Sequence, residues 1–89
     1  MTFRIQRSTN AAAIIFALSG VMDSAHIERL EKLLEAEKQR PILIDLENIT
    51  LVRREAVEFL ARLEEADIEI INCPDYVRTW IDAEKEVER

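Results

Sequence analysis

Short apolar segments alternate along this chain with longer segments whose apolar residues recur at helical spacing. Phe3 and Ile5 alternate with polar residues, so residues 2–7 are predicted to form a half-buried edge strand. Three further segments are predicted to form strands, of which the first two are apolar on both faces: 11–19, 42–46 and 67–73. The chain therefore supplies four strands, with a turn at "STN" between the first two.

Three amphipathic helices are predicted after the second, third and fourth strands. The first covers about 24–38, with Asp23 or Ser24 as its cap, and the second runs from about 53 to 66. The third begins at Pro74, because the fixed φ of proline suits a first helical position. Each helix has apolar residues on one side and charged residues on the other, so each is expected to pack on the sheet.

The order strand, strand, helix, strand, helix, strand, helix predicts one α/β domain over residues 1–89. An antiparallel hairpin opens a four-stranded mixed sheet, and parallel strands follow. Crossovers between parallel strands are right-handed, so strands added in sequence order place the three helices mainly on one face. The other face, lined by Ala and Ile, is then left for a partner or a second copy, so we also consider a homodimer.

Charge and composition exclude several classes of partner. The net charge is -6 and the pI about 4.8, which disfavours nucleic acid because the longest basic run is only Arg53–Arg54. No apolar run approaches the length of a membrane helix, so membrane insertion is not expected. The single cysteine, Cys73, excludes an internal disulfide and suits a cytoplasmic protein. Strand-like alternation at 2–7 disfavours a secretory signal there.

Functional residues are expected at one edge of the sheet. In open α/β sheets, binding sites lie outside the carboxyl ends of the parallel strands, which here gives the segments 20–24, 47–54 and 73–76. The predicted partner-binding residues lie in two of these segments and on the exposed side of the second helix: Arg53, Arg54, Glu55, Glu58, Asp23, Ser24, Asn48 and Thr50. Two adjacent cations at a helix start are unusual, because that position favours Ser, Thr, Asp or Asn.

Catalytic and metal chemistry have weaker support in the sequence. A thiol enzyme would use Cys73, with His26 as base and Asp45 to orient it, but nothing in their spacing demands this arrangement. No pair of residues has metal-ligand spacing, and Gly20 is the only glycine, so no metal site, phosphate loop or cofactor is expected. Tyr76 and Trp80 are expected either to pack on the sheet or to anchor an interface.

Three segments of the chain resemble the STAS domain, the fold of bacterial anti-sigma factor antagonists. "FALSGVMDSAHIERLEKLL" resembles its strand–Gly–x–x–Asp–helix opening, and "ILIDLENITLV" resembles the family signature before the second helix. "ADIEIINCPDYVRTWI" is similar to its closing strand and helix. The resemblance covers about the whole chain in pattern and implies a STAS-like arrangement of the sheet and helices.

In the switching members of that family, the second helix opens with Asp-Ser-Ser-Gly, and one serine is phosphorylated. The matching positions here are residues 53–56, so the acceptor falls on Arg54, or on Glu55 if the alignment slips by one. Neither side chain has a hydroxyl, so no phosphoacceptor is expected at this site. Two interpretations of the arginines stay open: loss of a cap in a domain relieved of switching, or a site that receives a partner's carboxylate or phosphate.

The resemblance implies a non-enzymatic protein-interaction module. Its partner would be an anti-sigma factor or a related signalling kinase, bound without the usual serine-phosphorylation switch, and its role would be in bacterial transcription regulation. A second hypothesis is a small accessory subunit of an ABC-type lipid or anion transport complex, whose partner is the transport ATPase. A small thiol enzyme that uses Cys73 is the third and least supported hypothesis.

Overall fold

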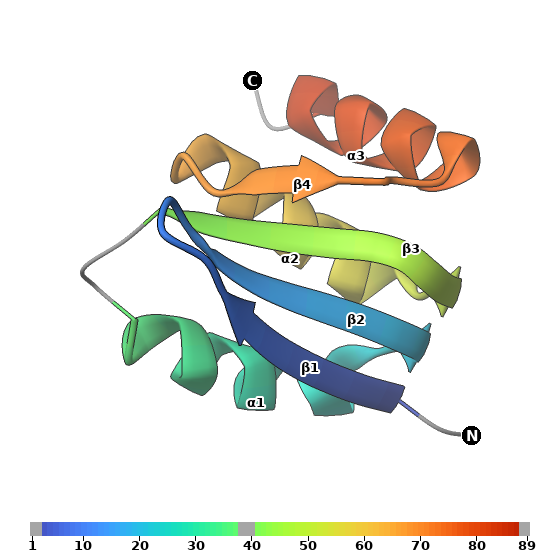
Figure 1. Ribbon diagram of the computed structural model, residues 1–89. Coiled ribbons are helices and arrows are strands. Elements are labelled where there is room, and N and C mark those ends of the chain that lie inside the picture. The colour runs from blue at the N-terminus through green and yellow to red at the C-terminus, as the bar shows by residue number, and fades with distance from the viewer. Residues whose placement is uncertain (1–2, 38–40, 88–89) are drawn as a thin grey trace.

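The structure of the protein, a computed structural model, describes residues 3–37 and 41–87. Its elements follow the predicted order (Figure 1): β1 (Phe3–Thr9), β2 (Ile14–Met22), α1 (Ser24–Glu35), β3 (Ile42–Val52), α2 (Arg54–Glu65), β4 (Glu69–Ile71) and α3 (Asp75–Val87). The strands form one sheet in the order β1-β2-β3-β4. β1 pairs with β2 in antiparallel fashion, and the other neighbours are parallel. The α/β class and the mixed sheet are therefore confirmed.

The helices form a second layer on one side of the sheet. In Figure 1, α1 and α2 lie behind the strands, and α3 continues this layer past the β4 edge, where it packs on α2. The opposite face is uncovered by any described element, as the topology predicts, and its apolar residues Ile15, Ala17, Leu43 and Ile71 are only partly buried. Helices therefore cover one face of the sheet, and no described element covers the other.

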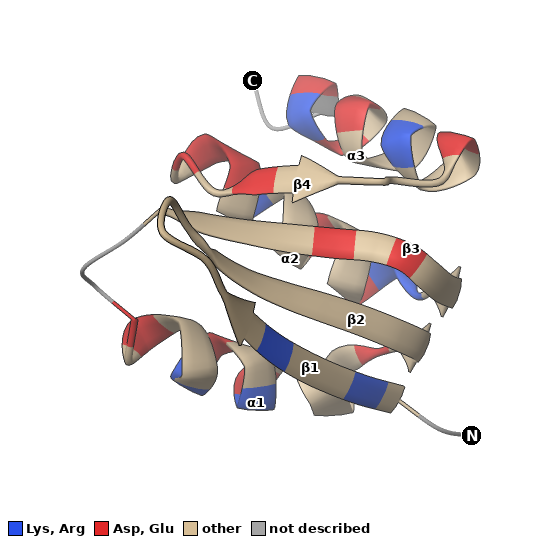
Figure 2. Ribbon diagram, viewed as in Figure 1, with Lys and Arg blue, Asp and Glu red and all other residues tan. Residues whose placement is uncertain are grey.

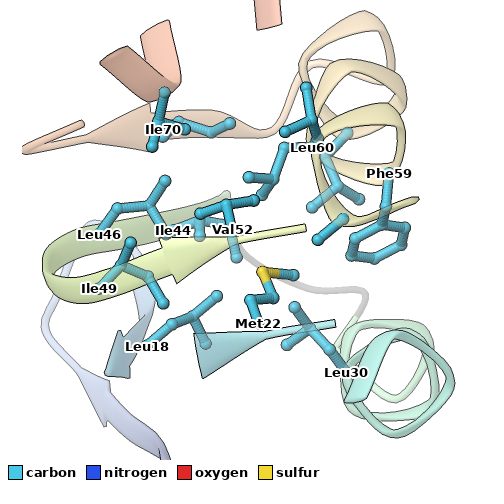
Figure 3. Close-up of a cluster of buried hydrophobic side chains, with 14 of the residues drawn as sticks. Leu18, Met22, Leu30, Ile44, Leu46, Ile49, Val52, Phe59, Leu60 and Ile70 are labelled. Carbon is cyan, nitrogen blue, oxygen red and sulfur yellow. The ribbon is translucent and has the colours of Figure 1, made fainter. Parts of the chain in front are cut away.

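The core lies between the sheet and the helices (Figure 3). Its fully buried side chains come from both central strands and all three helices; the largest are Phe16, Phe59, Leu18, Met22, Leu30, Ile44, Leu46, Leu60, Ile81, Val52 and Val77. Each such side chain contributes roughly 1.5–3 kcal/mol when it leaves water. Charges are kept outside this layer: the central strand β2 carries none, whereas α1 and α3 carry both signs (Figure 2).

The turn between β1 and β2 lies later than predicted. Strand β1 continues through Thr9, and the turn is built by Asn10, whose backbone N–H donates to the Ala13 carbonyl at 3.0 Å. The Asn10 side-chain oxygen also accepts from the N–H groups of Ala12 and Ala13, both at 2.8 Å. Such side-chain-to-backbone bonds stabilise turns. Residues 11–13 therefore precede β2, and the predicted strand start at 11 is wrong.

Strand β3 is much longer than the predicted 42–46, because its pairing with β2 continues to Val52 through two bulges. Ala17 pairs with Asp45 but Ser19 pairs with Asn48, so β3 has one extra residue there, and a second follows between Gly20 and Val21 of β2. Gly20 does not end β2 as expected; it lies within the strand at φ 93°, a value that favours glycine. The bulges bend β3 and keep it on the core as far as Val52.

Strand β4 is shorter than the predicted 67–73 and has only three residues. Asp67 and Asn72 have positive φ values of 70° and 53°, so the chain turns on both sides of the strand. As a result, β4 pairs only with Leu43–Asp45 of β3. The second half of β3 has no described strand beside it on that side, and Tyr76, in the first turn of α3, bonds the Thr50 carbonyl there.

Candidate functional site

The candidate site is built around the junction of β3 and α2. Met22 and Val52 are register partners, so Asp23 and Arg53, which follow them directly, leave the sheet side by side. The Arg53 N–H donates to the Met22 carbonyl at 2.9 Å, which ties the start of α2 to the end of β2. The Arg53 carbonyl accepts from the N–H groups of Ala56 and Val57, each at 3.0 Å. The backbone at this junction is therefore held on both sides.

The two helix starts at this edge are capped differently. Of the two caps that the sequence offers, Asp23 and Ser24, Asp23 is the cap of α1, and its carboxylate accepts from the Ala25 N–H at 3.0 Å. Arg53 occupies the same position on α2 with an extended backbone, but its side chain makes no capping hydrogen bond. The first turn of α2 therefore has N–H groups that its own cap residue does not satisfy.

Both arginine side chains point into solvent. Arg54 is 83% exposed, and its Nε lies 3.5 Å from Glu58 Oε2, one turn further along α2. An exposed pair at this distance contributes little to stability and exchanges readily with water. Within residues 3–37 and 41–87, Arg53 forms no ion pair. The site therefore presents two cations without a strong internal counter-charge.

An open groove of about 520 Å³ lies beside these arginines, between the start of α2 and the outer side of α3. We call it the α2–α3 groove. It is lined by Leu51, Val52, Arg53, Arg54, Val57, Trp80, Ala83 and Glu84. Most of the lining is apolar, and the charged side chains are two cations from α2 and one acid from α3. The sequence did not predict this groove.

Trp80 forms one wall of the groove and is 46% exposed. Its ring contacts Tyr76 edge to face, with centroids 5.4 Å apart and planes at 82°. The Tyr76 hydroxyl donates to the Thr50 carbonyl at 3.2 Å. Val77 and Ile81 fill the core side of α3 instead, so Tyr76 and Trp80 do not pack within the core. Both aromatic side chains are exposed, and an interface role for them stays a prediction.

An ion-pair cluster links α2 to α3, the two helices that border the groove, away from the groove itself. Glu64 accepts from both terminal nitrogens of Arg78, at 2.7 and 2.5 Å, and from Lys85 Nζ at 2.5 Å. Hydrogen bonds from Arg78 outweigh burial and lower the pKa of Glu64 to about 2. Arg78 also contacts Asp82 at 2.9 Å. The Glu64 side chain is only 14% exposed, so this is a partly buried pairing.

The remaining predicted partner-binding residues lie at the helix starts and within β3. Ser24 is exposed in the first turn of α1, and Glu55 is exposed in the first turn of α2. Asn48 and Thr50 are also exposed, but they lie on β3 and not in a loop, because of the bulges. Thr50 contributes its carbonyl to the Tyr76 contact. Ser24 and Glu55 therefore lie at the predicted edge, whereas the predicted placement of Asn48 and Thr50 beyond the strand end is wrong, because β3 continues to Val52. The roles of all four residues in binding stay predictions.

The geometry does not assemble the thiol site that the sequence left open. His26 stacks on Phe3 of the β1 edge at 4.4 Å, whereas Cys73 follows β4 at the other edge of the sheet. Burial raises the pKa of the Cys73 thiol, which disfavours the reactive thiolate. Asp45 accepts from the Glu47 N–H at 2.9 Å and from Asn72 Nδ2 at 3.2 Å, and so does not orient His26.

The chain matches no protein-family model, and no curated protein is significantly similar to it. Among the described residues, no three His, Cys, Asp or Glu side chains gather closely enough to hold a metal ion. Helices with the length and apolar character needed to cross a membrane are likewise not found in the described parts of the chain.

Proposed function

We propose that this protein is a STAS-like, non-enzymatic interaction module that binds a protein partner at the start of α2. The observation that carries the proposal is the exposed Arg53–Arg54 pair on a fixed backbone, at the position where the family resemblance implies a phosphoacceptor serine. The sheet order and the helix layer agree with the architecture that this resemblance implies. Serine phosphorylation at this site is excluded chemically, because neither side chain has a hydroxyl.

The arginines give the site its preference for an acidic group. A guanidinium group binds a carboxylate through two parallel hydrogen bonds, and the uncapped N–H groups of the first turn add to the positive potential. A partner surface with a carboxylate therefore docks here without the phosphorylation switch. Following the resemblance, the partner is an anti-sigma factor or related signalling kinase in the bacterial cytoplasm.

Affinity capture with matched charge variants tests this function. Wild-type protein is expected to capture a kinase-like regulator from a lysate of its own organism, whereas Arg53→Glu/Arg54→Glu captures at least tenfold less by quantitative mass spectrometry. The control is Arg4→Glu/Arg29→Glu, which changes the net charge equally on exposed residues outside the groove. Equal capture by wild type and the Arg53/Arg54 variant would refute the proposed binding site.

The identity of the captured protein separates the two partner classes. An ABC-type transport ATPase in place of a kinase-like regulator would favour the accessory-subunit hypothesis, even if the arginines prove necessary. If every variant instead captures further copies of this same chain, the protein forms a homodimer. Sedimentation analysis of the purified protein detects a homodimer directly.

A further inference from the structure

We propose that the α2–α3 groove receives a partner segment with one large apolar side chain and a carboxylate about one helical turn away. The apolar side chain lies against Trp80 and Val57, and the carboxylate binds Arg53. This inference rests on the proposed function, because it specifies the chemistry of the protein partner at the same edge.

The apolar half of the groove is suited to a single bulky side chain. Leu51, Val57 and Ala83 line it together with the exposed ring of Trp80. Trp80 is held by Tyr76, which is itself fixed by its hydrogen bond to Thr50. A ring that is already held in place loses little conformational freedom when a partner binds, and tryptophan is among the residues that dominate binding energy at interfaces.

The charged half of the groove determines which charge the partner segment should carry. The chain as a whole has a net charge of -6, yet Arg53 and Arg54 lie together on the groove. Arg53 has no ion pair among the described residues, and Arg54 has only the exposed contact with Glu58. An acidic group beside the bound apolar side chain therefore gains charge-assisted hydrogen bonds.

Glu84 adds a second constraint on the sequence of the bound segment. It lines the same groove from α3, so a segment with acidic residues along its whole length would be repelled there. The preferred segment is amphipathic, with its acid near α2 and a neutral or basic residue near Glu84. Complementarity of this kind selects both the partner and its orientation in the groove.

Selection from a phage-displayed library of random twelve-residue peptides tests the inference. Peptides enriched on the wild-type protein are expected to pair Trp, Phe, Leu or Met with Asp or Glu three or four positions away. Their synthetic forms should perturb the amide signals of Val57 and Ala83 and the Trp80 indole signal in NMR spectra. Enriched peptides without an acid, or no peptide that perturbs these signals, would overturn the proposal.

Two groove variants distinguish a loss of peptide binding from a loss of folding. Trp80→Ser removes the aromatic wall, and Ala83→Glu places a carboxylate in the groove at an exposed helical position. Each is expected to weaken binding of the selected peptides at least tenfold while the thermal unfolding midpoint changes little. Glu86→Ala, an exposed change on the same helix outside the groove lining, should bind like wild type. Unchanged binding by both groove variants would contradict the inference.

The same variants separate this inference from the proposed function. If the Arg53/Arg54 variant loses the captured partner but Ala83→Glu and Trp80→Ser keep it, the module binds a protein and the groove inference is wrong. If none of these variants loses the partner, the proposed binding site itself fails. Loss with both kinds of variant supports the two proposals together.

Discussion

The charged residues at the two ends of α2 differ in how they are paired. At its end, Glu64 is surrounded by Arg78 and Lys85 from α3, so an acid is satisfied within the protein by two cations. At its start, Arg53 and Arg54 are exposed, and within residues 3–37 and 41–87 they form a single ion pair, from Arg54 to Glu58 at 3.5 Å. Charges that are paired internally hold elements together, whereas exposed cations beside an apolar groove remain available to another molecule. One end of α2 thus stabilises the fold, and the other end forms part of the candidate binding site.

Removal of the Glu64 carboxylate should have the largest effect on stability. Glu64→Gln keeps the shape of the side chain but removes the acid that Arg78 and Lys85 share, and leaves Arg78 with only the exposed Asp82 among the described residues. This is expected to lower the free energy of unfolding by roughly 2–3 kcal/mol. Denaturant titration measures this change. Glu65→Gln, an exposed neighbour on the same helix, is the matched control and should stay within about 0.5 kcal/mol of wild type. Equal effects of the two changes would break the comparison.

Acid should weaken the protein through the same group. The folded pKa of Glu64, about 2, lies below its ordinary value of 4.5, so the folded state binds fewer protons. The contribution is therefore complete above about pH 5 and is lost as the pH falls from 4.5 toward 2. Unfolding midpoints recorded between pH 2 and 6 should fall more steeply for wild type than for Glu64→Gln. A hydrogen bond from Arg7 also lowers the pKa of Glu37, so the variant keeps some acid sensitivity.

A capping residue at the start of α2 should stabilise the protein. Arg53→Ser supplies a hydroxyl that accepts from the first turn, with an expected gain of about 0.5–1 kcal/mol in the free energy of unfolding. The mirror variant, Asp23→Ala, removes the existing cap of α1 and should cost about 1 kcal/mol. Chemical denaturation of both variants sharpens the comparison. A loss of stability with Arg53→Ser would mean that Arg53 supports the fold, contrary to our interpretation.

The smallest effect is expected at Arg54. Its contact with Glu58 is exposed, so Arg54→Ala should change the free energy of unfolding by less than about 0.5 kcal/mol. Raising the salt concentration should affect wild type and the variant alike. A larger loss, removed by high salt, would show that the pair stabilises α2 and is not free for a partner.

The hydrophobic pattern predicts the order and the type of every element, because burial of one helix face and of alternating strand positions dominates this small fold. It does not predict the length of β3. Leu46, Ile49 and Val52 are three residues apart, a spacing that is not typical of a regular strand and arises here from the two bulges. A glycine inside a strand is a known signal of such irregularity, and Gly20 could have indicated it.

Only part of the candidate site can be predicted from the sequence. The position of Arg53 and Arg54 follows from the order of β3 and α2, so the start of the helix is predicted directly. The groove depends on how α3 lies against α2, which is set by long-range contacts such as Glu64–Arg78. Tyr76 and Trp80 are adjacent in the helical pattern to Val77 and Ile81, and periodicity alone does not say which pair faces inward.

The bulges of β3 also determine where Arg53 and Arg54 leave the sheet. Each one adds a residue to β3 without lengthening β2, so the residues that follow keep their partners on β2 and their faces, and Val52 still pairs with Met22 directly before Arg53. A change in residue number that the bulges do not absorb would shift this register by one and turn the following strand residues over. Insertions and deletions between Ile44 and Arg53 should therefore be tolerated less than substitutions at exposed positions there. A protein engineer who transplants this binding edge to another scaffold must carry over the number of residues along with the arginines.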